Sequence, residues 1–378
     1  MNNFESIGNV ENLVGKRVFV RADFNVPIKD GKVADDFRIK KTLPLLSFLR
    51  KQGAKIILSS HIAGSESDSL APVYRYLASR FQIKNERFEF VPDYFPNRPS
   101  ALSDLGADIV LLENLRKYKE EEANDENFSK HLSSFADIYV NEAFSVSHRP
   151  HASIVGIPRH LPRYAGLLFE QEVKNLSESF DPPRPFLFIL GGAKFETKIT
   201  LLKKFLVQAD YVFVGGALAN NIFKARGKEI GKSRVSEKEF DIGDIIDDSK
   251  MTVPVDVVVK NQKGSISKAI EQVLPDETIM DAGPQSLSML QTLLLKSKFV
   301  LWNGPLGNYE LGYKMATHDL ARAIAQSRRR SIVGGGDTLA AIHELNLFSK
   351  FSFVSTGGGA MLDFLADGTL VGLDALKK

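Results

Sequence analysis

Short runs of apolar residues recur along the chain, and each is followed by a turn and then by a segment with helical periodicity. Within the runs, β-branched and aromatic residues follow one another without polar alternation, as expected for strands buried on both faces of a parallel sheet. Segments 42–52 and 198–209 have the amphipathic pattern of helices, and strands that alternate with helices predict an α/β fold. The predicted strands are 17–21, 55–59, 108–112, 137–140, 186–190, 211–214, 255–259, 299–302, 331–333 and 351–354.

A proline-rich segment, Asp181-Pro182-Pro183-Arg184-Pro185, is the strongest interruption of this pattern. Three prolines in four positions can neither continue a helix nor join a β-ladder, and a charged helical segment at 168–179 precedes them. A chain of 378 residues corresponds to two domains, or three at most, at about 150 residues per domain. We therefore place the junction between two domains at 181–185.

The composition excludes several kinds of partner and chemistry. The net charge of +3, from 49 basic and 46 acidic residues, is too small to predict a nucleic-acid or membrane-surface protein. The chain has no cysteine, which excludes disulfides, thiolate catalysis and cysteine-ligated zinc. The N-terminal segment lacks the basic and apolar regions of a signal peptide, and no run approaches the ~18 apolar residues of a spanning helix. We expect a cytoplasmic protein that binds neither nucleic acid nor membrane.

Basic and polar side chains follow four of the strands predicted for the first half. Ligands of open parallel sheets bind outside the carboxyl ends of the strands, where such side chains would form a cationic pocket for phosphate or carboxylate oxygens. Each one alone is more simply explained as a solvated or turn residue, but their recurrence at four strand ends favours the pocket. The His-x-x-His pair at 148–151 leaves zinc open as a minor alternative. The side chains are Asp23, Asn25, Arg38, His61, Arg116, His148, Arg149 and His151.

Glycine-rich turns follow four strands of the second half instead. Glycine lets backbone amides approach a phosphate, and a helix N-terminus adds a positive dipole. One such turn is equally well explained by close helix–strand packing, whereas four in one domain favour a nucleotide or polyphosphate site. The turns are Gly191-Gly192-Ala193-Lys194, Gly215-Gly216-Ala217, Gly334-Gly335-Gly336-Asp337-Thr338 and Gly357-Gly358-Gly359-Ala360.

Familiar short motifs do not account for these turns. Segment 227–233 has one residue too few between its glycines for a P-loop, and it does not follow a buried strand. None of the turns contains G-x-G-x-x-G, so a Rossmann dinucleotide site is unsupported. The chain also lacks the G-x-S-x-G nucleophile elbow and the HRD and DFG motifs of protein kinases.

Seven longer blocks, in this order, resemble the phosphoglycerate kinase family over nearly the whole chain. They are RVFVRADFNVP at 17–27, LLENLR at 111–116, YVNEAFSVSHRPHAS at 139–153, LGGAKFETKI at 190–199, WNGPLGNYE at 302–310, IVGGGDT at 332–338 and STGGGAMLDFL at 355–365. The resemblance implies two Rossmann-like three-layer α/β/α domains with parallel sheets, facing each other across a hinged cleft. It implies a 3-phosphoglycerate-binding domain at 1–165, a connecting helix and hinge at 166–185, a nucleotide-binding domain at 186–366 and a tail at 367–378 that returns to the first domain.

The reaction implied by the resemblance is reversible phosphoryl transfer from 1,3-bisphosphoglycerate to ADP, giving 3-phosphoglycerate and ATP with Mg²⁺ as cofactor. The family is glycolytic and its members are usually monomers. In the reverse direction, the attacking carboxylate is already ionised and needs no general base. Catalysis then depends on alignment and on neutralising the transferred group, and closure of the hinge would gate turnover.

Residue roles are carried over only where the blocks match. By resemblance, the glycerate substrate is held by Asp23, Asn25, Arg38, His61, Arg116 and Arg149. The nucleotide site comprises Gly192, Ala193, Lys194, Lys198, Gly216, Gly283, Asn303, Pro305, Glu310, Gly335, Gly336, Asp337 and Thr338, with Glu310 as the ribose partner and Asp337 as the Mg²⁺ ligand. The catalytic set is Arg38, Lys198, Gly336 and Gly359.

One departure concerns the substrate site. Where the family has Ser-His-Leu-Gly-Arg-Pro, this chain has Ser60-His61-Ile62-Ala63-Gly64-Ser65, so Gly64 replaces an arginine. A lost charge-assisted contact corresponds to ~1.5–3 kcal/mol if nothing replaces it. The segments 195–197 and 308–309 also differ from the usual family sequence, and we expect these differences to have less effect.

Two alternatives remain beside an active phosphoglycerate kinase. Gly64 motivates a kinase of the same fold that acts on another small carboxylate. A weakened nucleotide-binding protein with an interaction role is the other alternative, but the retention of Arg38, Lys198 and Asp337 argues against it.

Overall fold

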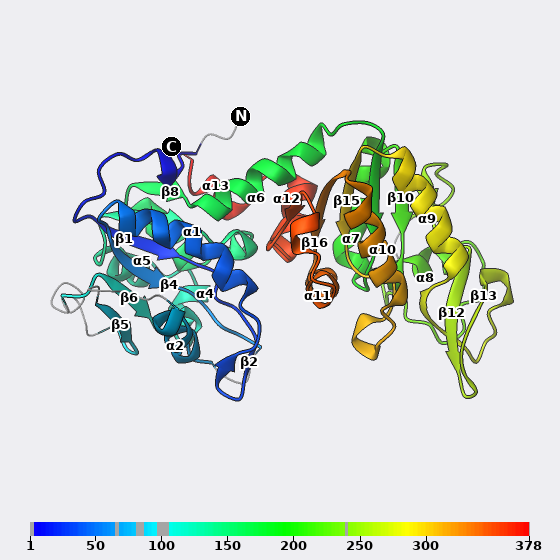
Figure 1. The fold of residues 1–378 in the computed structure, drawn as a ribbon, viewed down its shortest axis with the longest axis horizontal. Helices are drawn as coiled ribbons and strands as arrows, with labels where there is room; N and C mark the ends of the chain where they lie inside the picture. Colours follow the sequence, from blue (N-terminus) through cyan, green and yellow to red (C-terminus); the bar gives the residue numbers. More distant parts are fainter. Residues whose placement is uncertain (1–3, 65–67, 81–86, 97–105, 239–240, 378) are drawn as a thin grey trace. The chain divides into compact units, whose positions relative to one another are not determined.

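The computed structural model describes residues 4–64, 68–80, 87–96, 106–238 and 241–377 (Figure 1). The chain divides into two compact units, one formed by Met1–Lys174 with Asp367–Lys378 and the other by Asn175–Ala366. Each unit contains a parallel sheet flanked by helices, which confirms the α/β fold predicted from the apolar runs.

The first unit is built on a six-stranded sheet in the order β5-β6-β4-β1-β7-β8, and its strands are all parallel. The strands are β1 (Arg17–Arg21), β4 (Lys55–Ser59), β5 (Phe88–Val91), β6 (Ile109–Leu112), β7 (Ile138–Asn141) and β8 (Arg163–Ala165). A small ribbon pairs β2 (Ile28–Lys29) with β3 (Lys32–Val33). The helices are α1 (Phe37–Lys51), α2 (Ala71–Arg80), α4 (Lys119–Glu122), α5 (Glu126–Ser133) and α13 (Val371–Asp374), and α6 (Leu167–Ser177) crosses the boundary between the units.

Residues 367–378 complete the first unit although they follow the second unit in the chain. Gly372 in α13 donates its backbone amide to the Ser147 carbonyl oxygen at 2.8 Å. Lys377 forms a β-bridge with Phe4, and its carbonyl oxygen accepts a hydrogen bond from the Arg163 side chain. The segment is therefore tied to both ends of the first unit's sequence.

The second unit contains a parallel sheet in the order β11-β10-β9-β15-β16-β17. Counted along the chain, this is the order 3-2-1-4-5-6 of the Rossmann fold. The strands are β9 (Phe186–Leu190), β10 (Tyr211–Val214), β11 (Met251–Thr252), β15 (Phe299–Asn303), β16 (Arg330–Gly334) and β17 (Phe353–Val354). The helices are α7 (Phe195–Gln208), α8 (Gly216–Ala225), α9 (Pro284–Lys296), α10 (Met315–Ser327), α11 (Gly336–Glu344) and α12 (Gly359–Asp367).

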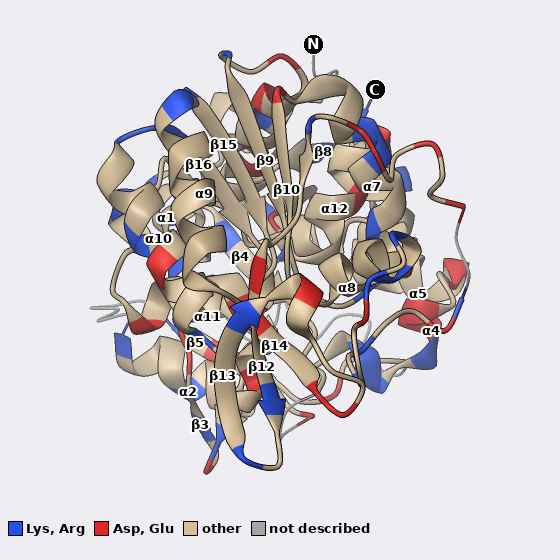
Figure 2. Ribbon diagram, turned by 90° about the vertical axis from the view of Figure 1, so that its right-hand side faces the viewer, with Lys and Arg blue, Asp and Glu red and all other residues tan. Residues whose placement is uncertain are grey.

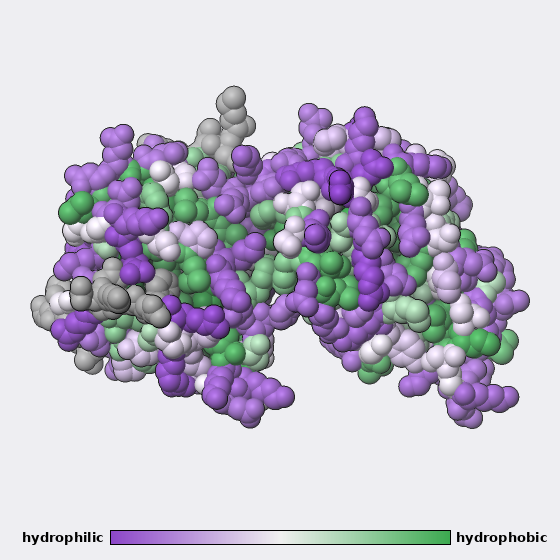
Figure 3. All heavy atoms as spheres, in the orientation of Figure 1, coloured by the Kyte–Doolittle hydropathy of each residue, from purple (hydrophilic) through white to green (hydrophobic). Residues whose placement is uncertain are grey.

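Right-handed crossovers explain the layers of the second unit. The chain moves one way across the sheet from β9 to β11 and the other way from β15 to β17, so the connecting helices fall on opposite faces. Accordingly α7 contacts α8, while α10 contacts both α9 and α11 (Figure 1). Strands β9 and β15 are fully buried between these layers, whereas hydrophilic side chains cover much of each unit on the face drawn in Figure 3.

One predicted strand belongs to a different sheet. The segment 255–259 was expected in a parallel sheet, but β12 (Asp256–Asn261) pairs antiparallel with β13 (Gly264–Ala269) and β14 (Thr278–Ala282) in a separate three-stranded sheet. The turn at 262–263 reverses the chain directly after β12, and β13 is mostly exposed. Acidic and basic residues are interspersed over this sheet (Figure 2). An apolar run alone does not distinguish the two kinds of pairing.

Candidate active site

The strand order of the second unit reverses between β9 and β15, and ligands of open α/β sheets bind at such a switch point. Here the loops that follow the two strands touch. A Cβ atom on Gly191 would lie 2.2 Å from the Pro305 carbonyl oxygen, and one on Gly304 would lie 2.3 Å from the Gly191 carbonyl oxygen. Both positions therefore require glycine, because the loops pack backbone against backbone.

Lys198, in the first turn of α7, places its ammonium group beside these loops. Its Nζ donates a hydrogen bond to the Gly191 carbonyl oxygen at 2.5 Å, and Cβ atoms on Gly192 and Gly304 would lie 3.0 and 2.9 Å from it. The pKa of Lys198 is lowered to about 8, mainly by burial and to a smaller extent by Lys194, although the Asp337 carboxylate opposes this change. A bound anion would favour the charged form of this amine.

The start of α11 joins the same cluster of loops. The Gly304 amide donates a hydrogen bond to Thr338 Oγ1 at 3.0 Å. The neighbouring Asp337 has a raised pKa, first because it is partly buried and then because of the Glu310 carboxylate, while Lys198 opposes the change. Two carboxylates that repel each other are thus held near one lysine, an arrangement that a further cation would stabilise.

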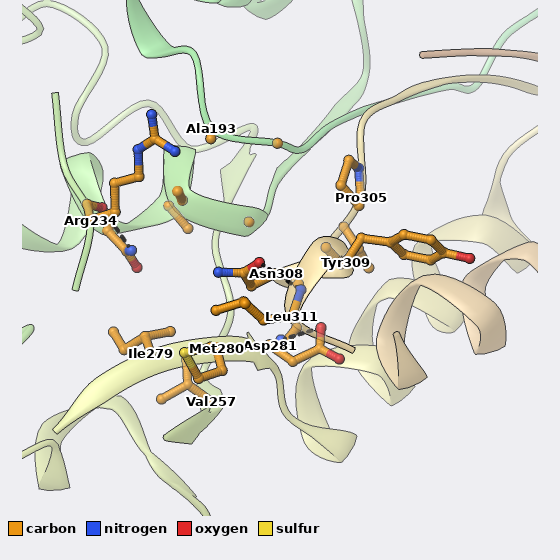
Figure 4. Close-up of a pocket in the computed structure, with 18 of the residues that line it drawn as sticks. Ala193, Arg234, Val257, Ile279, Met280, Asp281, Pro305, Asn308, Tyr309 and Leu311 are labelled. Atoms are coloured by element: carbon orange, nitrogen blue, oxygen red, sulfur yellow. Dashed lines mark hydrogen bonds between the residues drawn. The ribbon is translucent and has the colours of Figure 1, made fainter. Parts of the chain in front are cut away.

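A cavity of about 380 Å³ opens between α8, β14 and the loop after β15 (Figure 4). This volume lies within the range of small-molecule sites. Its walls combine apolar and polar groups, and the side chains of Asn308 and Leu311 face it, whereas that of Tyr309 points away (Figure 4). The predicted nucleotide-site residues that line it are Gly192, Ala193, Gly216, Pro305, Glu310 and Asp337, and the apolar lining includes Ala219, Phe223, Val257, Ile279, Met280 and Leu306.

In the first unit, the corresponding switch point lies at β1, which is flanked by β4 and β7. Asp23, directly after β1, accepts hydrogen bonds from Arg38 Nη1 at 2.6 Å and from the Ser145 hydroxyl. The Asn25 amide bonds the other carboxylate oxygen at 3.1 Å, and Asn25 Oδ1 accepts from the Ala63 amide at 3.0 Å. Asp23 therefore fixes the position of Arg38, and Asn25 links the loops after β1 and β4.

His61 is a buried, neutral hydrogen-bond donor. Its Nδ1 lies 3.2 Å from Nη2 of Arg21, an arginine in β1 that is 1% exposed. Because arginine can only donate, Nδ1 accepts and the proton resides on Nε2. Burial lowers the pKa of His61 well below its usual value, and Arg21, Arg116 and Arg38 lower it further.

Arg116 and Arg149 add two more cations to this end of the sheet. Burial lowers the pKa of Arg116, and Arg149 is the largest electrostatic cause of the same change. The carboxylate of Glu122 lies 3.4 Å from Arg116 Nε. We call Arg21, Arg38, His61, Arg116 and Arg149 the basic cluster. Arg21, Arg116 and Arg38 lower the pKa of His61, and Arg149 lowers that of Arg116, so an anionic ligand would relieve the repulsion among these cations.

Known proteins are similar to this chain over nearly its whole length. The phosphoglycerate kinase family model matches residues 7–368. The chain belongs to the phosphoglycerate kinase family. The phosphoglycerate kinase of Wolbachia pipientis wMel is 41% identical over 100% of this chain and 99% of its own, and that of Dictyoglomus turgidum is 40% identical over 97% of each. The solved phosphoglycerate kinases of Coxiella burnetii and Pyrococcus horikoshii are 34% and 30% identical, with TM-scores of 0.83 and 0.85 over 99% and 98% of this chain and 98% of each of theirs.

Members of the phosphoglycerate kinase family use nucleotides and other small molecules as substrates, and the site residues predicted by resemblance lie in both units. In the first unit, the structure brings five predicted residues together at the carboxyl ends of the strands. They are Asp23, Asn25, Arg38, His61 and Arg116. In the second unit, the predicted nucleotide-site residues that lie beside the cavity rather than on its wall include Lys198, Asn303, Gly335 and Thr338.

Gly283 has a different environment from the other glycines. Its amide donates to the Asp256 carbonyl oxygen at 2.9 Å, and a Cβ atom would lie 2.3 Å from Asp256 Cγ. Packing against Asp256 therefore accounts for glycine at this position. The preceding residue, Ala282, lines the cavity, and a nucleotide contact of Gly283 remains a prediction.

Several residues of the two sites did not emerge from the sequence. Arg21 lies within a buried strand, and a charged residue in such a strand was an available signal for an internal partner. Asp281, in the cavity wall, is 4% exposed and has a pKa that burial raises to about 7. Arg234 and Asn308 also line the cavity. Only the folded chain brings these residues to the sites.

The histidine pair at 148–151 does not form a metal site. The described residues contain no group of three or more His, Cys, Asp or Glu side chains arranged to hold a metal ion. Burial, together with Arg116 and Arg21, lowers the pKa of His151 to about 4. Such cationic surroundings disfavour a bound cation.

Among the described helices, none combines the length and apolar character needed to cross a membrane.

Proposed function

We propose that this chain catalyses reversible phosphoryl transfer between 1,3-bisphosphoglycerate with ADP and 3-phosphoglycerate with ATP, as a cytoplasmic monomer acting in glycolysis and gluconeogenesis. The observation that carries the proposal is the basic cluster at the switch point of one unit, in a chain whose other unit has glycine loops around Lys198. The two sites match the chemistry of a small phosphorylated acid and of a nucleotide polyphosphate.

The basic cluster would bind the glycerate substrate. Arg116 and Arg149 would hold its phosphate, and the Nε2–H group of His61 would donate to an oxygen of the same ligand. Arg38, oriented by Asp23, would reach the carboxylate that exchanges the phosphoryl group. Asn25 would keep the adjoining loops at a fixed distance from the ligand.

The nucleotide would be divided between the cavity and the glycine loops. The apolar part of the cavity would take the base, and Glu310 would bind the ribose hydroxyls. Lys194, Lys198, Gly216 and the segments 192–193 and 335–338 would surround the phosphates, with Asn303, Pro305 and Gly283 supporting them. Asp337 fits the Mg²⁺ expected with the nucleotide, because Mg²⁺ is usually bound by one or two carboxylates together with substrate phosphates.

The reaction needs alignment and charge neutralisation rather than a proton acceptor. In ATP synthesis and in its reversal, Arg38 and Lys198 would neutralise the oxygens of the transferred group, and the amides of Gly336 and Gly359 would donate to them. Phosphate binding would restore the full charge of Lys198. Mg²⁺ would supply further charge neutralisation at the nucleotide phosphates. Because the substrates are assigned to domains 1–165 and 186–366, the segment 166–185 would act as the hinge of turnover.

A coupled assay tests the proposal. The protein is supplied with 3-phosphoglycerate and MgATP, and glyceraldehyde-3-phosphate dehydrogenase reports the product as loss of NADH. Turnover supports the proposed reaction, whereas intact nucleotide binding without turnover would show a binding protein instead. Turnover with another small carboxylate alone, measured as ADP formation, would support the second candidate. That candidate is favoured by Gly64, which has no side chain where the family has an arginine. Gly64 has a φ of +70°, and no described atom lies within 4 Å of the position of its Cβ.

A further inference from the structure

The segment that carries Glu310 is short and, apart from Tyr309, exposed, and Glu310 lies close to another carboxylate. Glu310 lies in η8 (Tyr309–Leu311), a single 3₁₀ turn. It shares the cavity wall with Asp337, and its charge raises the pKa of Asp337. Since like charges repel, we expect attractive contacts from neighbouring side chains to keep η8 close to the start of α11.

Helix α11 carries a second acidic residue on the face that bears Asp337. Glu344 follows Asp337 by seven residues, so the two lie on the same face, about two turns or ~10 Å apart along the helix. Lys314 Nζ lies 2.7 Å from Glu344 Oε1, and His318 Nε2 lies 3.4 Å from Glu344 Oε2. The second acidic residue thus anchors side chains from outside α11.

Tyr309 connects this group of side chains to η8. Its hydroxyl lies 3.3 Å from His318 Nε2, and Lys314 Nζ lies 4.5 Å from the centre of its ring. Burial and a hydrogen bond to Glu344 raise the pKa of Tyr309, so the hydroxyl stays protonated. Tyr309 belongs to the cavity lining, but its ring points away from the cavity (Figure 4), so its hydroxyl meets this group of side chains rather than the cavity.

We propose that a clamp formed by Tyr309, Lys314, His318 and Glu344 holds η8 against α11 and thereby positions Glu310 and Asp337 for the nucleotide. Tyr309 is the positioning residue that acts through its neighbour Glu310. The inference rests on the proposed function, because it requires Glu310 to bind the ribose. It also gives a role to position 309, where the chain departs from the usual family wording.

The ribose dependence of binding separates positioning from general structural support. Calorimetry measures the affinity of the full chain for metal-free ADP and for 2′,3′-dideoxy-ADP, which lacks the hydroxyls that Glu310 would bind. Tyr309→Phe removes one hydrogen-bonding hydroxyl and should weaken ADP binding about fivefold. It should change the affinity for the dideoxy analogue less than 1.5-fold. Glu344→Gln keeps the size of the side chain and should cause the same ribose-dependent loss.

Tyr313→Phe is the matched control. It removes a hydroxyl that lies 2.9 Å from Ser265 Oγ on β13, outside the clamp, and it should change neither affinity. Equal weakening of both ligands by Tyr309→Phe and Glu344→Gln would overturn the clamp. Glu310→Ala distinguishes the two levels of the argument: if it shows no ribose-dependent loss, the ribose assignment itself is wrong. A ribose-dependent loss in Glu310→Ala, absent from both clamp variants, would refute the clamp alone.

Discussion

Replacing Gly64 with arginine would return a cation to the loop after β4, beside the basic cluster. The structure predicts two separate effects. Gly64 has a φ of +70°, and an L-residue in this left-handed region costs about 1–2 kcal/mol. No protein atom among the described residues lies within 4 Å of the position of its Cβ, so no steric cost adds to the strain. We expect the free energy of unfolding of Gly64→Arg to fall by about 1–2 kcal/mol.

The affinity for substrate should change in the opposite direction. A charge-assisted hydrogen bond contributes about 1.5–3 kcal/mol, and about 1.4 kcal/mol corresponds to a tenfold change in affinity. The loop is exposed to solvent, so the lower end of this range applies. The backbone strain is present with and without ligand and does not reduce the gain. The KM for 3-phosphoglycerate should therefore fall about tenfold, with little change in the KM for ATP.

The coupled assay measures both KM values, and thermal or urea unfolding measures the strain. Gly15→Arg is the control. Gly15 also has a φ of +70° with no described atom near the Cβ position, but it precedes β1 and so lies at the amino ends of the strands, opposite the basic cluster. The control should lose the same stability and leave both KM values unchanged. If the KM for 3-phosphoglycerate stays within twofold of the original in Gly64→Arg, an arginine at this position does not contribute to substrate binding, and the prediction is wrong.

Three further substitutions test other parts of the structure. Nucleotide phosphates should restore the charged form of Lys198, whose pKa burial lowers to about 8, so ADP binding near pH 8.5–9 should take up a proton. Calorimetry in buffers of different ionisation enthalpy measures this uptake, and Lys198→Arg should abolish it; an unchanged uptake would assign the proton to another group. Arg38→Ala should lower kcat about 100-fold and change the ATP dissociation constant less than twofold, whereas parallel losses would contradict its assigned role. Burial raises the pKa of Glu142 to about 8 although the Leu168 and Phe169 amides oppose the change. The folded state therefore binds a proton that the unfolded state, with a pKa near 4.5, releases. Its contribution to stability is complete below about pH 4.5 and is lost as the pH rises through 8. Glu142→Gln should flatten the pH dependence of unfolding in this window, and an unaltered curve would show that Glu142 is not its source.

The sequence predicted most of the central strands because their surroundings are uniform. Strands such as β1 and β9 are buried on both faces, so nothing polar interrupts their apolar runs. Edge strands were harder to recognise: β5 is only partly buried along most of its length, and β8 has three residues. The hairpin of β12 and β13 was missed as a unit because an apolar run does not reveal the direction of its neighbour.

The sites were predictable to the extent that local motifs encode them. Residues in the loops after neighbouring strands, such as Asp23 after β1 and His61 after β4, lie at the same end of one sheet because parallel strands end together. Partners chosen by tertiary packing have no such local signal. The hydrogen bond between Arg21 and His61 joins neighbouring strands, and it determines which nitrogen of the imidazole carries the proton. Asp281 and Asn308 line the cavity from β14 and from the loop after β15, and nothing in their own segments predicted that meeting.

The place of residues 367–378 in the first unit has a consequence for biosynthesis. A ribosome translates the whole of the second unit before it reaches this segment, so the nascent first unit lacks part of its interior during that time. Leu370, Leu373 and Leu376 are at most 4% exposed in the complete chain, and burying each contributes about 1.5–3 kcal/mol. The first unit can therefore reach its final stability only after the last leucines have been added, although most of its residues are translated first.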